Sequence, residues 1–528
     1  MMRFDMEKGR LRALLAHAGA ALTVSALIAG CGNNYRPVVT PITPSGPAAQ
    51  PTSYAVVVSS TGATTPGVAT IIDYSGDTVM ATAPIGPGPV AFTIDEVASN
   101  GYTVNSDGTM TNFPVTTSLQ AKNITVSTLP STADLVNLTA PSTGLWTADL
   151  TGNVVDIFKG SPETFNLAVP VATFPVMVVG APTISGQRYF VLSQNPQQLS
   201  SFSSTTCNIS PSTVGENGEI TPIETSFVAD AAINLDPTAG NGTTNAQCPV
   251  YAIESTDQKR LFVMNRGSDT VSVINVQNNT LDQCAPFIDQ TGQTVSCHPI
   301  LPLSTTAVTN TGVTPPNGTA GMTATAGPVE AEYNPATSQL VVANYDGGTI
   351  SVIDVSLDQY GNDSPTFGTT YTIKVGNTAN PLPASVTVLS DGSKAYTANQ
   401  GDCTPDCTTS PNGTVSVVNL STHTLEKTLT VVGNPRTVLN TQNSEYDKVY
   451  AAAPNSPYIT IIETTPTEID VIDTTVLVDG NVVDLRLTTQ TGTSGNNNYS
   501  SRVPGYGQPC NLPGASQTDT LADCRAIQ

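Results

Sequence analysis

Few residues in this chain have the type and spacing that catalysis needs. The histidines are His17, His298 and His423, and no motif of a serine hydrolase, zinc protease, phosphate-binding loop or dinucleotide-binding loop occurs. A Ser–His–Asp triad needs a histidine between a nucleophile and a carboxylate, and neither His298 nor His423 lies in such a motif. We therefore predict no catalytic residue, no metal ligand and no cofactor, and we expect that the chain is not an enzyme.

The cysteines indicate a different chemistry. Cys31 stands alone at the end of an apolar segment, and eight further cysteines fall into four couples that are close in sequence. The predicted disulfides are Cys207–Cys248, Cys284–Cys297, Cys403–Cys407 and Cys510–Cys524. Each would stabilise the fold by about 2–4 kcal/mol in the loop-entropy description. Zinc binding is the alternative, but no histidine or second cysteine pair accompanies Cys403 and Cys407.

Residues 1–30 predict export. Four basic residues precede a short apolar stretch from Leu14 to Ala29, as in a secretory signal peptide. The stretch ends Leu27-Ile-Ala-Gly-Cys31, which resembles the lipobox of bacterial lipoproteins. That resemblance implies a lipid on Cys31; a plain cleaved signal with a chance cysteine is the alternative. Residues 31–53 are rich in Pro, Ser and Thr and are expected to form an extended tether.

The lipid would anchor the chain in the bacterial cell envelope. No Asp follows Cys31, which favours the outer membrane over retention at the inner membrane. The formal net charge is −22, which argues against binding to nucleic acid or to an anionic lipid surface. The acidic stretch from Asp358 to Asp363 could bind calcium, but it lacks the spacing of a calcium loop, so an ordinary Asx turn is the preferred interpretation.

A repeated pattern of strands and turns fills the middle of the chain. Each copy has an apolar run, a Gly/Asn/Asp turn, an alternating run, a further strand and a Pro/Gly turn. The copies begin their first long strand at Tyr54, Tyr102, Leu145, Tyr189, Leu261, Leu340, Ala395 and Val449. A spacing of about 40–50 residues is typical of a propeller blade. We predict an all-β propeller over residues 54–487 with eight four-stranded blades; seven blades is the alternative.

The later copies resemble a known repeat. LFVMN-RGSD-TVSVIN from Leu261, LVVAN-YDGG-TISVID from Leu340 and AYTAN with TVSVVN from Ala395 resemble the YVTN-type β-propeller repeat. A Val-Gly-x-x-Pro turn, as in Val432 to Pro435, follows in that family. The resemblance implies a bacterial or archaeal exported or surface protein, and some family members resemble lactonase-type propellers. The literal Tyr-Val-Thr-Asn string does not occur in this chain.

The ends of the repeat array predict how the ring closes. The array begins with the second strand of a blade and ends with a lone first strand, Asn481 to Leu487. We expect this last strand to complete the first blade and thereby join the two ends of the ring. Residues 488–528 are rich in Gly, Asn and Ser and are predicted to form an irregular tail held by the Cys510–Cys524 disulfide.

Repeated carboxylates permit two interpretations. The third strand of a blade is expected to end at an aspartate in three copies, at Asp73, Asp156 and Asp354. A turn-capping role is preferred, because residues repeated at one blade position usually belong to the architecture. The alternative is a ring of carboxylates near one mouth of the channel, where it could bind a cation.

The function that follows from these observations is a noncatalytic module. We expect a lipid-anchored binding or scaffold propeller of the cell envelope, whose long insertions hold a protein or glycan partner. The alternative is a propeller hydrolase similar to the lactonases, with a metal or carboxylate site in the central channel. That alternative depends on analogy with the fold.

Overall fold

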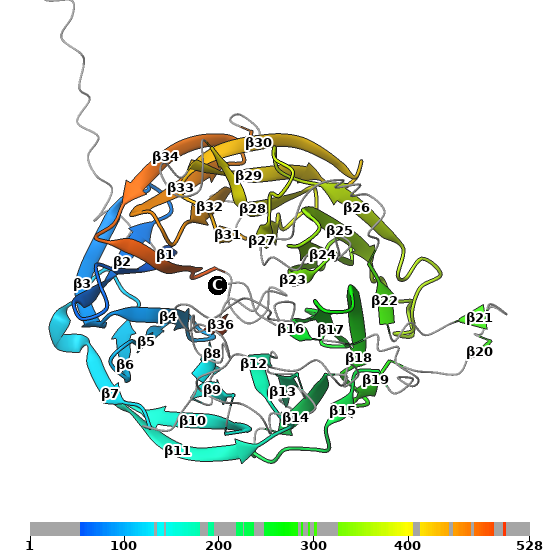
Figure 1. Ribbon diagram of the computed structural model, residues 1–528, viewed down its shortest axis with the longest axis horizontal. Helices are drawn as coiled ribbons and strands as arrows, with labels where there is room; N and C mark the ends of the chain where they lie inside the picture. The colour runs from blue at the N-terminus through cyan, green and yellow to red at the C-terminus, as the bar shows by residue number, and fades with distance from the viewer. Residues whose placement is uncertain are drawn as a thin grey trace, which may run out of the picture. The chain divides into compact units, whose positions relative to one another are not determined.

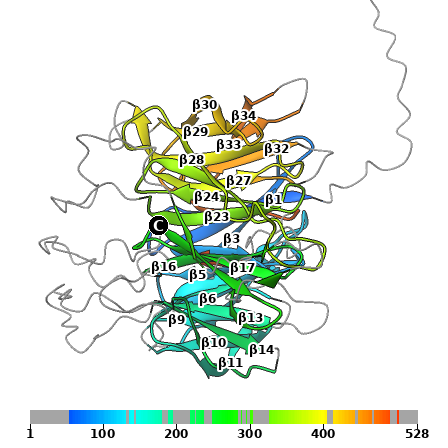
Figure 2. The same ribbon diagram turned by 90° about the vertical axis from the view of Figure 1, so that its right-hand side faces the viewer.

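The computed structural model is an eight-bladed β-propeller with almost no helix (Figure 1). It describes residues 53–130, 135–141, 144–150, 152–179, 188–194, 218–224, 226–236, 246, 248–282, 287–288, 294–295, 300–303, 326–404, 412–442, 447–465, 469–489 and 500–502. Each blade is an antiparallel sheet, so the prediction of eight blades is confirmed and seven is wrong. Figure 2 shows the same ring from the side.

The strands of each blade are given in order from the centre of the ring outward. Blade 1 contains β35 (Asn481–Leu487), β1 (Tyr54–Ser60), β2 (Pro66–Asp73) and β3 (Val79–Pro87). Blade 2 contains β4 (Pro89–Ile94), β5 (Asn100–Asn105), β6 (Thr109–Pro114) and β7 (Thr125–Thr128). Blade 3 contains β8 (Leu135–Thr139), β9 (Leu145–Asp149), β10 (Val154–Gly160) and β11 (Glu163–Pro170). Blade 4 contains β12 (Pro175–Val179), β13 (Arg188–Ser193), β14 (Glu219–Glu224) and β15 (Ile233–Asn234).

The second half of the ring follows the same plan. Blade 5 contains β16 (Pro249–Glu254), β17 (Arg260–Asn265), β18 (Thr270–Asn275) and β19 (Thr280–Leu281). Blade 6 contains β23 (Pro328–Asn334), β24 (Gln339–Asn344), β25 (Thr349–Asp354) and β26 (Thr370–Lys374). Blade 7 contains β27 (Pro383–Val388), β28 (Lys394–Thr404), β29 (Asn412–Asn419) and β30 (Thr424–Val432). Blade 8 contains β31 (Thr437–Asn440), β32 (Lys448–Ala452), β33 (Tyr458–Glu463) and β34 (Val471–Leu477).

A few short elements lie outside this plan. They are η2 (Ala121–Asn123), the hairpin of β20 (Phe287–Ile288) and β21 (Thr294–Val295), β22 (Ile300–Pro302), which pairs with β18, and β36 (Ser500–Arg502). The segment predicted as an irregular tail therefore contains a strand, β36, which pairs with β8 at the centre of the ring. No helix in the described ranges is long and apolar enough to cross a membrane.

Burial explains which strands are apolar throughout and which alternate between apolar and polar residues. Every residue of β17 is buried, because the inner strands of a blade have a neighbouring blade on each face. The outermost strands alternate instead; β34 exposes every second residue along most of its length. Val, Ile and Thr suit both settings, since β-branched side chains pack well on a pleated surface.

The repeated Asn of the second strand has a defined role. In blade 6 the Asn344 side-chain amide donates to the hydroxyls of Thr349 at 3.0 Å and Ser351 at 2.8 Å on the next strand. The same bonds occur in blades 2, 5 and 7, from Asn105, Asn265 and Asn399. The Asn-turn-Thr-x-Ser sequence is therefore a hydrogen-bond code that sets the register of the hairpin.

The Gly of the Pro/Gly turn joins consecutive blades. The backbone N–H of Gly86, at the end of blade 1, donates to the Thr111 hydroxyl of blade 2 at 3.1 Å. A Cβ at Gly86 would lie 2.2 Å from the side-chain nitrogen of Asn105, so only glycine fits there. Gly376 makes the equivalent bond to Ser416 of the following blade at 2.9 Å.

The ring closes as predicted. β35 pairs antiparallel with β1, with Leu487 opposite Ala55 and Asn481 opposite Ser60. Leu485 and Leu487 are fully buried in one cluster with Tyr450 of blade 8. The last strand of the array thus completes the first blade and packs it against the eighth.

The strand-end carboxylates divide into two kinds. Asp73 and Asp354 end their strands and accept hydrogen bonds from the N–H groups of Ser75 and Ser356, which confirms the turn-capping role. The grouping of Asp156 with them was wrong, because Asp156 lies inside β10, opposite Thr147 of β9. The expectation failed because β10 continues past Asp156 to Gly160, so Asp156 does not stand at the end of its strand.

Candidate functional site

The inner strands carry the candidate site, and one row of residues reveals it. Near the start of most inner strands, one residue has no partner on the second strand, which makes a β-bulge. By this register the row reads Val90, Val136, Val176, Val250, Val329, Ala384, Arg436 and Val483 from blade 2 round to blade 1. Arg436 is the one polar residue in a row that otherwise needs only small aliphatic side chains.

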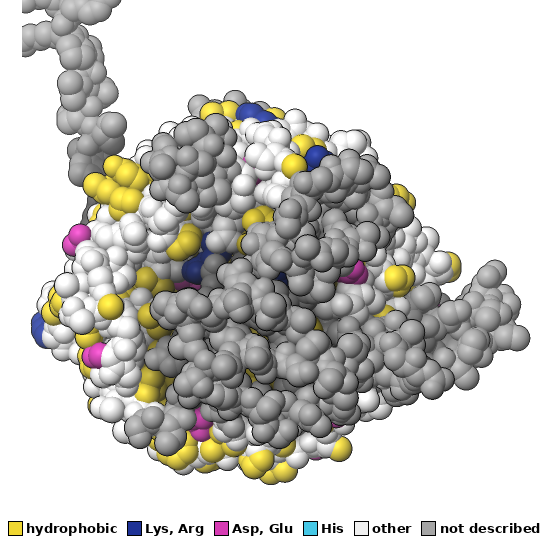
Figure 3. Space-filling model, in the orientation of Figure 1, with side chains coloured by type: hydrophobic (Ala, Val, Ile, Leu, Met, Phe, Trp, Pro, Cys, Tyr) yellow, Lys and Arg dark blue, Asp and Glu magenta, His cyan; other side chains and the backbone are white. Residues whose placement is uncertain are grey.

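Other charged groups surround Arg436. Its guanidinium donates to the carbonyl oxygen of Val483 in the next blade. Burial lowers the pKa of Arg436. The nearby carboxylates of Asp484 and Glu330 raise that pKa, and the nearby Arg486 lowers it. Two guanidinium groups and two carboxylates therefore act on one another near the centre of the ring. Figure 3 shows basic side chains in this region of the face.

Hydrogen bonds link these groups from blade to blade. The Ser385 hydroxyl of β27 donates to Glu330 of β23 at 2.7 Å. The Thr437 hydroxyl of β31 donates to Asp484 of β35 at 3.2 Å. Asp484 also pairs with the guanidinium of Arg486 at 2.9 Å, and both side chains are largely buried.

Glu332 lies on the same face of β23 as Glu330, two residues further along. It is 1% exposed, and the side-chain amide of Gln442 donates to it at 2.9 Å. Burial raises the pKa of Glu332 to about 8, although a hydrogen bond from the Thr387 side chain acts in the opposite direction. Glu332 is therefore mostly protonated at neutral pH, while Glu330 is partly exposed to solvent. We call Glu330, Glu332, Arg436, Asp484 and Arg486 the charged arc.

A pocket of about 340 Å³ opens between blades 7 and 8, beside the charged arc. Asn440 and Gln442 line it, and both belong to the hydrogen-bond network around Glu332. Lys394 and Lys448 line its outer part. The pocket offers a small polar molecule a place next to the inner strands of these blades.

The rim lysines belong to the architecture. Lys448 and Tyr450 of blade 8 contact Asp77 in the outer turn of blade 1, at 2.5 and 3.2 Å. Lys394 and Tyr396 of blade 7 contact Asp470 in the corresponding turn of blade 8. Because the contact repeats at one blade position, it is best understood as a joint between neighbouring blades.

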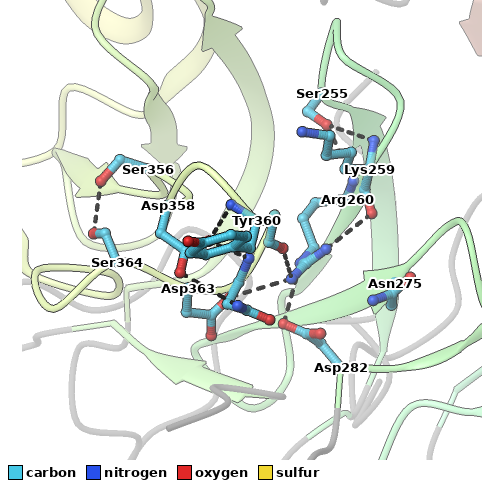
Figure 4. Close-up of polar contacts among 12 residues, drawn as sticks. Ser255, Lys259, Arg260, Asn275, Asp282, Ser356, Asp358, Tyr360, Asp363 and Ser364 are labelled. Carbon is cyan, nitrogen blue, oxygen red and sulfur yellow. Dashed lines mark hydrogen bonds and ion pairs between the residues drawn. The ribbon is translucent and has the colours of Figure 1, made fainter. Parts of the chain in front are cut away.

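Blade 5 makes a related joint with arginine (Figure 4). Arg260 pairs with Asp282 of its own blade at 3.2 Å and with Asp363 of blade 6 at 3.4 Å. Burial raises the pKa of Asp282 to about 6, although Arg260 lowers it. Asp358 accepts bonds from the N–H groups of Tyr360 and Asn362, so this loop is the Asx turn that the sequence predicted.

Most residues singled out from the sequence lie outside the described ranges. These are Cys31, Cys207, Cys284, Cys297, Cys407, Cys510, Cys524 and His298. Cys248 is disulfide-bonded, and its partner is outside the described residues, so the four pairings stay predictions. The ring of His423 stacks on the ring of Tyr371 at the surface, away from the inner strands, with the two ring centroids 3.7 Å apart.

Sequence reasoning missed the charged arc. The signal was present: Arg436 follows a proline where blades 2, 4, 5, 6 and 7 have Pro-Val or Pro-Ala, and Glu330 and Glu332 interrupt an apolar inner strand. No group of three or more His, Cys, Asp and Glu side chains in the described ranges could hold a metal ion. The site is therefore interpreted through its arginines and carboxylates.

Comparison with known proteins gives the fold a context. No protein-family model and no curated protein matches the chain. A Bacteroides fragilis protein described as a candidate 6-phosphogluconolactonase is 13% identical, over 84% of this chain and 99% of that one, with a TM-score of 0.46. The periplasmic gluconolactonase of Pseudomonas aeruginosa is 13% identical, over 82% and 98%, with a TM-score of 0.44. The dihydro-heme d1 dehydrogenase NirN is 11% identical, over 85% and 78%, with a TM-score of 0.50.

These comparisons correct the functional expectation. At such identities the likeness establishes the fold alone, yet the similar structures are described as lactonases and a dehydrogenase. The expectation of a noncatalytic scaffold that is not an enzyme is therefore wrong, and its alternative, a propeller hydrolase, is favoured. A search for catalytic motifs contiguous in sequence does not test for sites assembled from residues of several blades.

Proposed function

We propose that this chain is a β-propeller hydrolase that opens lactones at a carboxylate–arginine site in the central channel. The observation that carries the proposal is the isolated Arg436 in an aliphatic row, with Glu330 and Asp484 near it. Buried charge is costly and is retained where chemistry needs it. The lactonases among the similar structures suggest the substrate class.

The arc offers the groups that ester hydrolysis requires. The carboxylate of Glu330 takes a proton from water, and the water oxygen attacks the lactone carbonyl carbon. The guanidinium of Arg436 stabilises the negative charge that develops on the carbonyl oxygen. When the ring C–O bond breaks, Glu330 returns the proton to the leaving oxygen, and the product is a hydroxy acid.

Glu332 and Asp484 set the protonation of these groups. Because Glu332 is mostly neutral at pH 7, Glu330 can ionise without a second negative charge on the same strand. Asp484 pairs with Arg486 and leaves the Arg436 guanidinium bonded to a neutral carbonyl. Arg436 and Glu330 are the proposed catalytic residues, and the others position them.

The test uses glucono-δ-lactone and a pH indicator, with the uncatalysed rate subtracted. We expect the wild type to accelerate ring opening, Arg436→Val to lower kcat about 10²–10³-fold, and Glu330→Gln to lower it about 10²–10⁴-fold. Arg436→Val restores the residue type of the other blades, so it should fold. Arg266→Gln is the matched control, because Arg266 pairs with Asp346 in a turn outside the arc.

Two outcomes would overturn the proposal. One is a wild-type rate equal to buffer for glucono-δ-lactone and for simpler δ- and γ-lactones. The other is a folded Arg436→Val variant that keeps the wild-type kcat. If Arg266→Gln lowers kcat as much as Arg436→Val, general destabilisation explains the loss and the assignment of Arg436 is wrong.

We further propose that the chain is an exported lipoprotein of the YVTN-propeller type, anchored through Cys31. The basic start, the apolar stretch and Leu27 to Cys31 support the anchor, and the Asn–Thr–Ser bonds of blades 5, 6 and 7 support the repeat type. Expression in a Gram-negative host with labelled palmitate tests the anchor. Label should enter the wild type and not Cys31→Ser; equal labelling of both would refute the proposal.

A further inference from the structure

A hydroxyl recurs at one position of the third strand in all blades except one. By register with the second strand, the position is held by Thr70, Thr111, Asp156, Thr221, Ser272, Ser351, Ser416 and Thr460 in blades 1 to 8. In blades 2, 5, 6 and 7 the hydroxyl accepts a hydrogen bond from the Asn side chain of its own blade. In blades 2, 4 and 7 it accepts one from a backbone N–H of the preceding blade. Blade 3 has a carboxylate there instead.

The partner position in blade 3 is also acidic. Blades 1 to 8 carry Ser59, Asn105, Asp149, Ser193, Asn265, Asn344, Asn399 and Ala453 at the end of the second strand. Where Asn faces Ser in blades 5, 6 and 7, the two side chains lie 2.8–2.9 Å apart. Blade 3 therefore places Asp149 and Asp156 where the other blades make a direct hydrogen bond.

Both carboxylates are removed from water. Asp149 is 6% exposed and Asp156 is 5% exposed. The residues opposite Asp156 on the flanking strands are Thr147 and Ala168, neither of which carries a charge. Asp149 accepts a hydrogen bond from the N–H of Gly152 at 3.0 Å.

Charged neighbours lie elsewhere. Of blade 3, Lys159 and Glu163 are at the opposite end of the β10–β11 hairpin. On the side of blade 2, β4, β6 and β7 carry no titratable side chain, and Tyr102 of β5 lies by Glu163 and Asp95. On the other side, β12 carries none, and Tyr189 of β13 packs on Trp146. Blade 4 also carries Arg188, opposite Glu224, and Glu219, opposite Ser193. Asp107, in the turn of blade 2, is exposed and bonds Thr109.

We propose that Asp149 and Asp156 share one proton, and that this pair makes blade 3 a pH-sensitive element of the ring. Two adjacent buried carboxylates cannot both ionise without strong repulsion, whereas a shared proton restores the hydrogen bond of the other blades. Consistent with this, burial and, to a smaller extent, the charge of Asp149 raise the pKa of Asp156 to about 6.

A proton fits this site better than a cation does. Calcium takes six to eight oxygen ligands, and the described residues offer two carboxylates. Val154 also stands where blades 2, 5, 6 and 7 have a threonine, so blade 3 lacks the hydroxyl that they have at that position. The replacement leaves an apolar wall beside the pair.

The sign of the pH dependence follows from the direction of the shift. The folded chain holds the shared proton more tightly than the unfolded chain does, so folding is favoured below the unfolded pKa of an aspartate. That stability is lost as pH rises through the folded pKa of Asp156, about 6. Blade 3 should therefore loosen as pH rises from about 4 to 6.5.

The test is thermal unfolding of the wild type and of Asp149→Asn/Asp156→Ser, which restores the residues of blades 5 to 7. Between about pH 4 and pH 6.5 the wild type should lose about 2–4 °C more in Tm than the variant does. Asp156→Asn, which keeps the shape of the side chain, serves if the double variant does not fold. Asp107→Asn, an exposed carboxylate nearby, should keep the wild-type profile.

Two results would overturn the proposal. Identical pH profiles of the wild type and the variants would show that the pair does not share a proton. A wild-type Tm that rises with calcium at pH 7.5 and falls with a chelator, but not in the double variant, would show a cation in place of the proton. Neither result depends on lactone hydrolysis, so this inference stands or falls apart from the proposed function.

Discussion

The inner ring has two halves that share one backbone plan and differ in chemistry. Each innermost strand contributes one residue to each of two inward rows. In blades 6, 7, 8 and 1 the first row consists of Glu330, Ser385, Thr437 and Asp484. The second row consists of Glu332, Thr387, Leu439 and Arg486. In blades 2 to 5 they read Ala91, Asn137, Met177, Tyr251 and Thr93, Thr139, Val179, Ile253. We call the second half the plain arc.

The plain arc shows what the fold itself requires. Its side chains are aliphatic, aromatic or neutral polar, and Asn137 and Thr139 find backbone partners in blade 4. Since both arcs close the same ring, the charges of the other arc are not needed for closure. Charges at such positions cost desolvation free energy, which is why we assign them to chemistry.

The largest effect should come from breaking the strand that joins the two arcs. Deleting residues 481–528 removes β35, whose Val482, Leu485 and Leu487 are buried. Each such side chain contributes about 1.5–3 kcal/mol, and total stability is about 5–15 kcal/mol, so the ring should not fold cooperatively. Deleting only residues 490–528 keeps β35 and should retain a sharp melting transition. A sharp transition in both deletions would contradict closure by β35.

A charge placed in the plain arc should have the next largest effect. Met177 of β12 occupies the row of Glu330 and is 2% exposed. Met177→Glu would bury a carboxylate without the Ser385-type donor of the charged arc, at a cost of about 3–5 kcal/mol at neutral pH. Met177→Leu should cost less than about 1.5 kcal/mol. Urea denaturation measures both, and equal midpoints would show that the arcs are interchangeable.

Glu332 allows the charged arc to be titrated. Its pKa is raised to about 8, so its contribution to stability is complete below the unfolded glutamate pKa and is lost as pH rises through about 8. Relative to Glu332→Gln, the wild type should lose about 1.4 kcal/mol per pH unit across that window. Urea midpoints at several pH values test this, and parallel curves for the two proteins would be the contrary result.

The rim joint beside the charged arc should give the smallest effect. Tyr450→Phe removes the hydroxyl that donates to Asp77 at 3.2 Å and should lower the free energy of unfolding by about 1–2 kcal/mol. Tyr458, on the same blade, is 36% exposed, and Tyr458→Phe should change stability by less than about 0.5 kcal/mol. If the two variants melt alike, the joint does not hold blades 8 and 1 together.

Prediction from sequence succeeded where the signal is local and repeated. The Asn-turn-Thr-x-Ser code and the Pro/Gly turns act within some 20 residues, so strand order, blade number and the closing strand Asn481–Leu487 could be derived before the structure was seen. Register inside a degenerate copy could not, which is why Asp156 was assigned to the wrong position. The third strand of blade 3 runs on past Asp156 to Gly160, so this aspartate does not mark a strand end as Asp73 and Asp354 do.

The sequence by itself determined the all-β ring, because hairpin hydrogen bonds and alternating burial depend on neighbours along the chain. Only the tertiary structure decided that Glu330, Arg436 and Asp484 lie near one another. They come from blades 6, 8 and 1, and ring closure brings these blades together. The same holds for the Asp149–Asp156 pair, whose contact depends on the register of one hairpin. Charge clusters of this kind are properties of distance in space, and sequence separation carries no record of them.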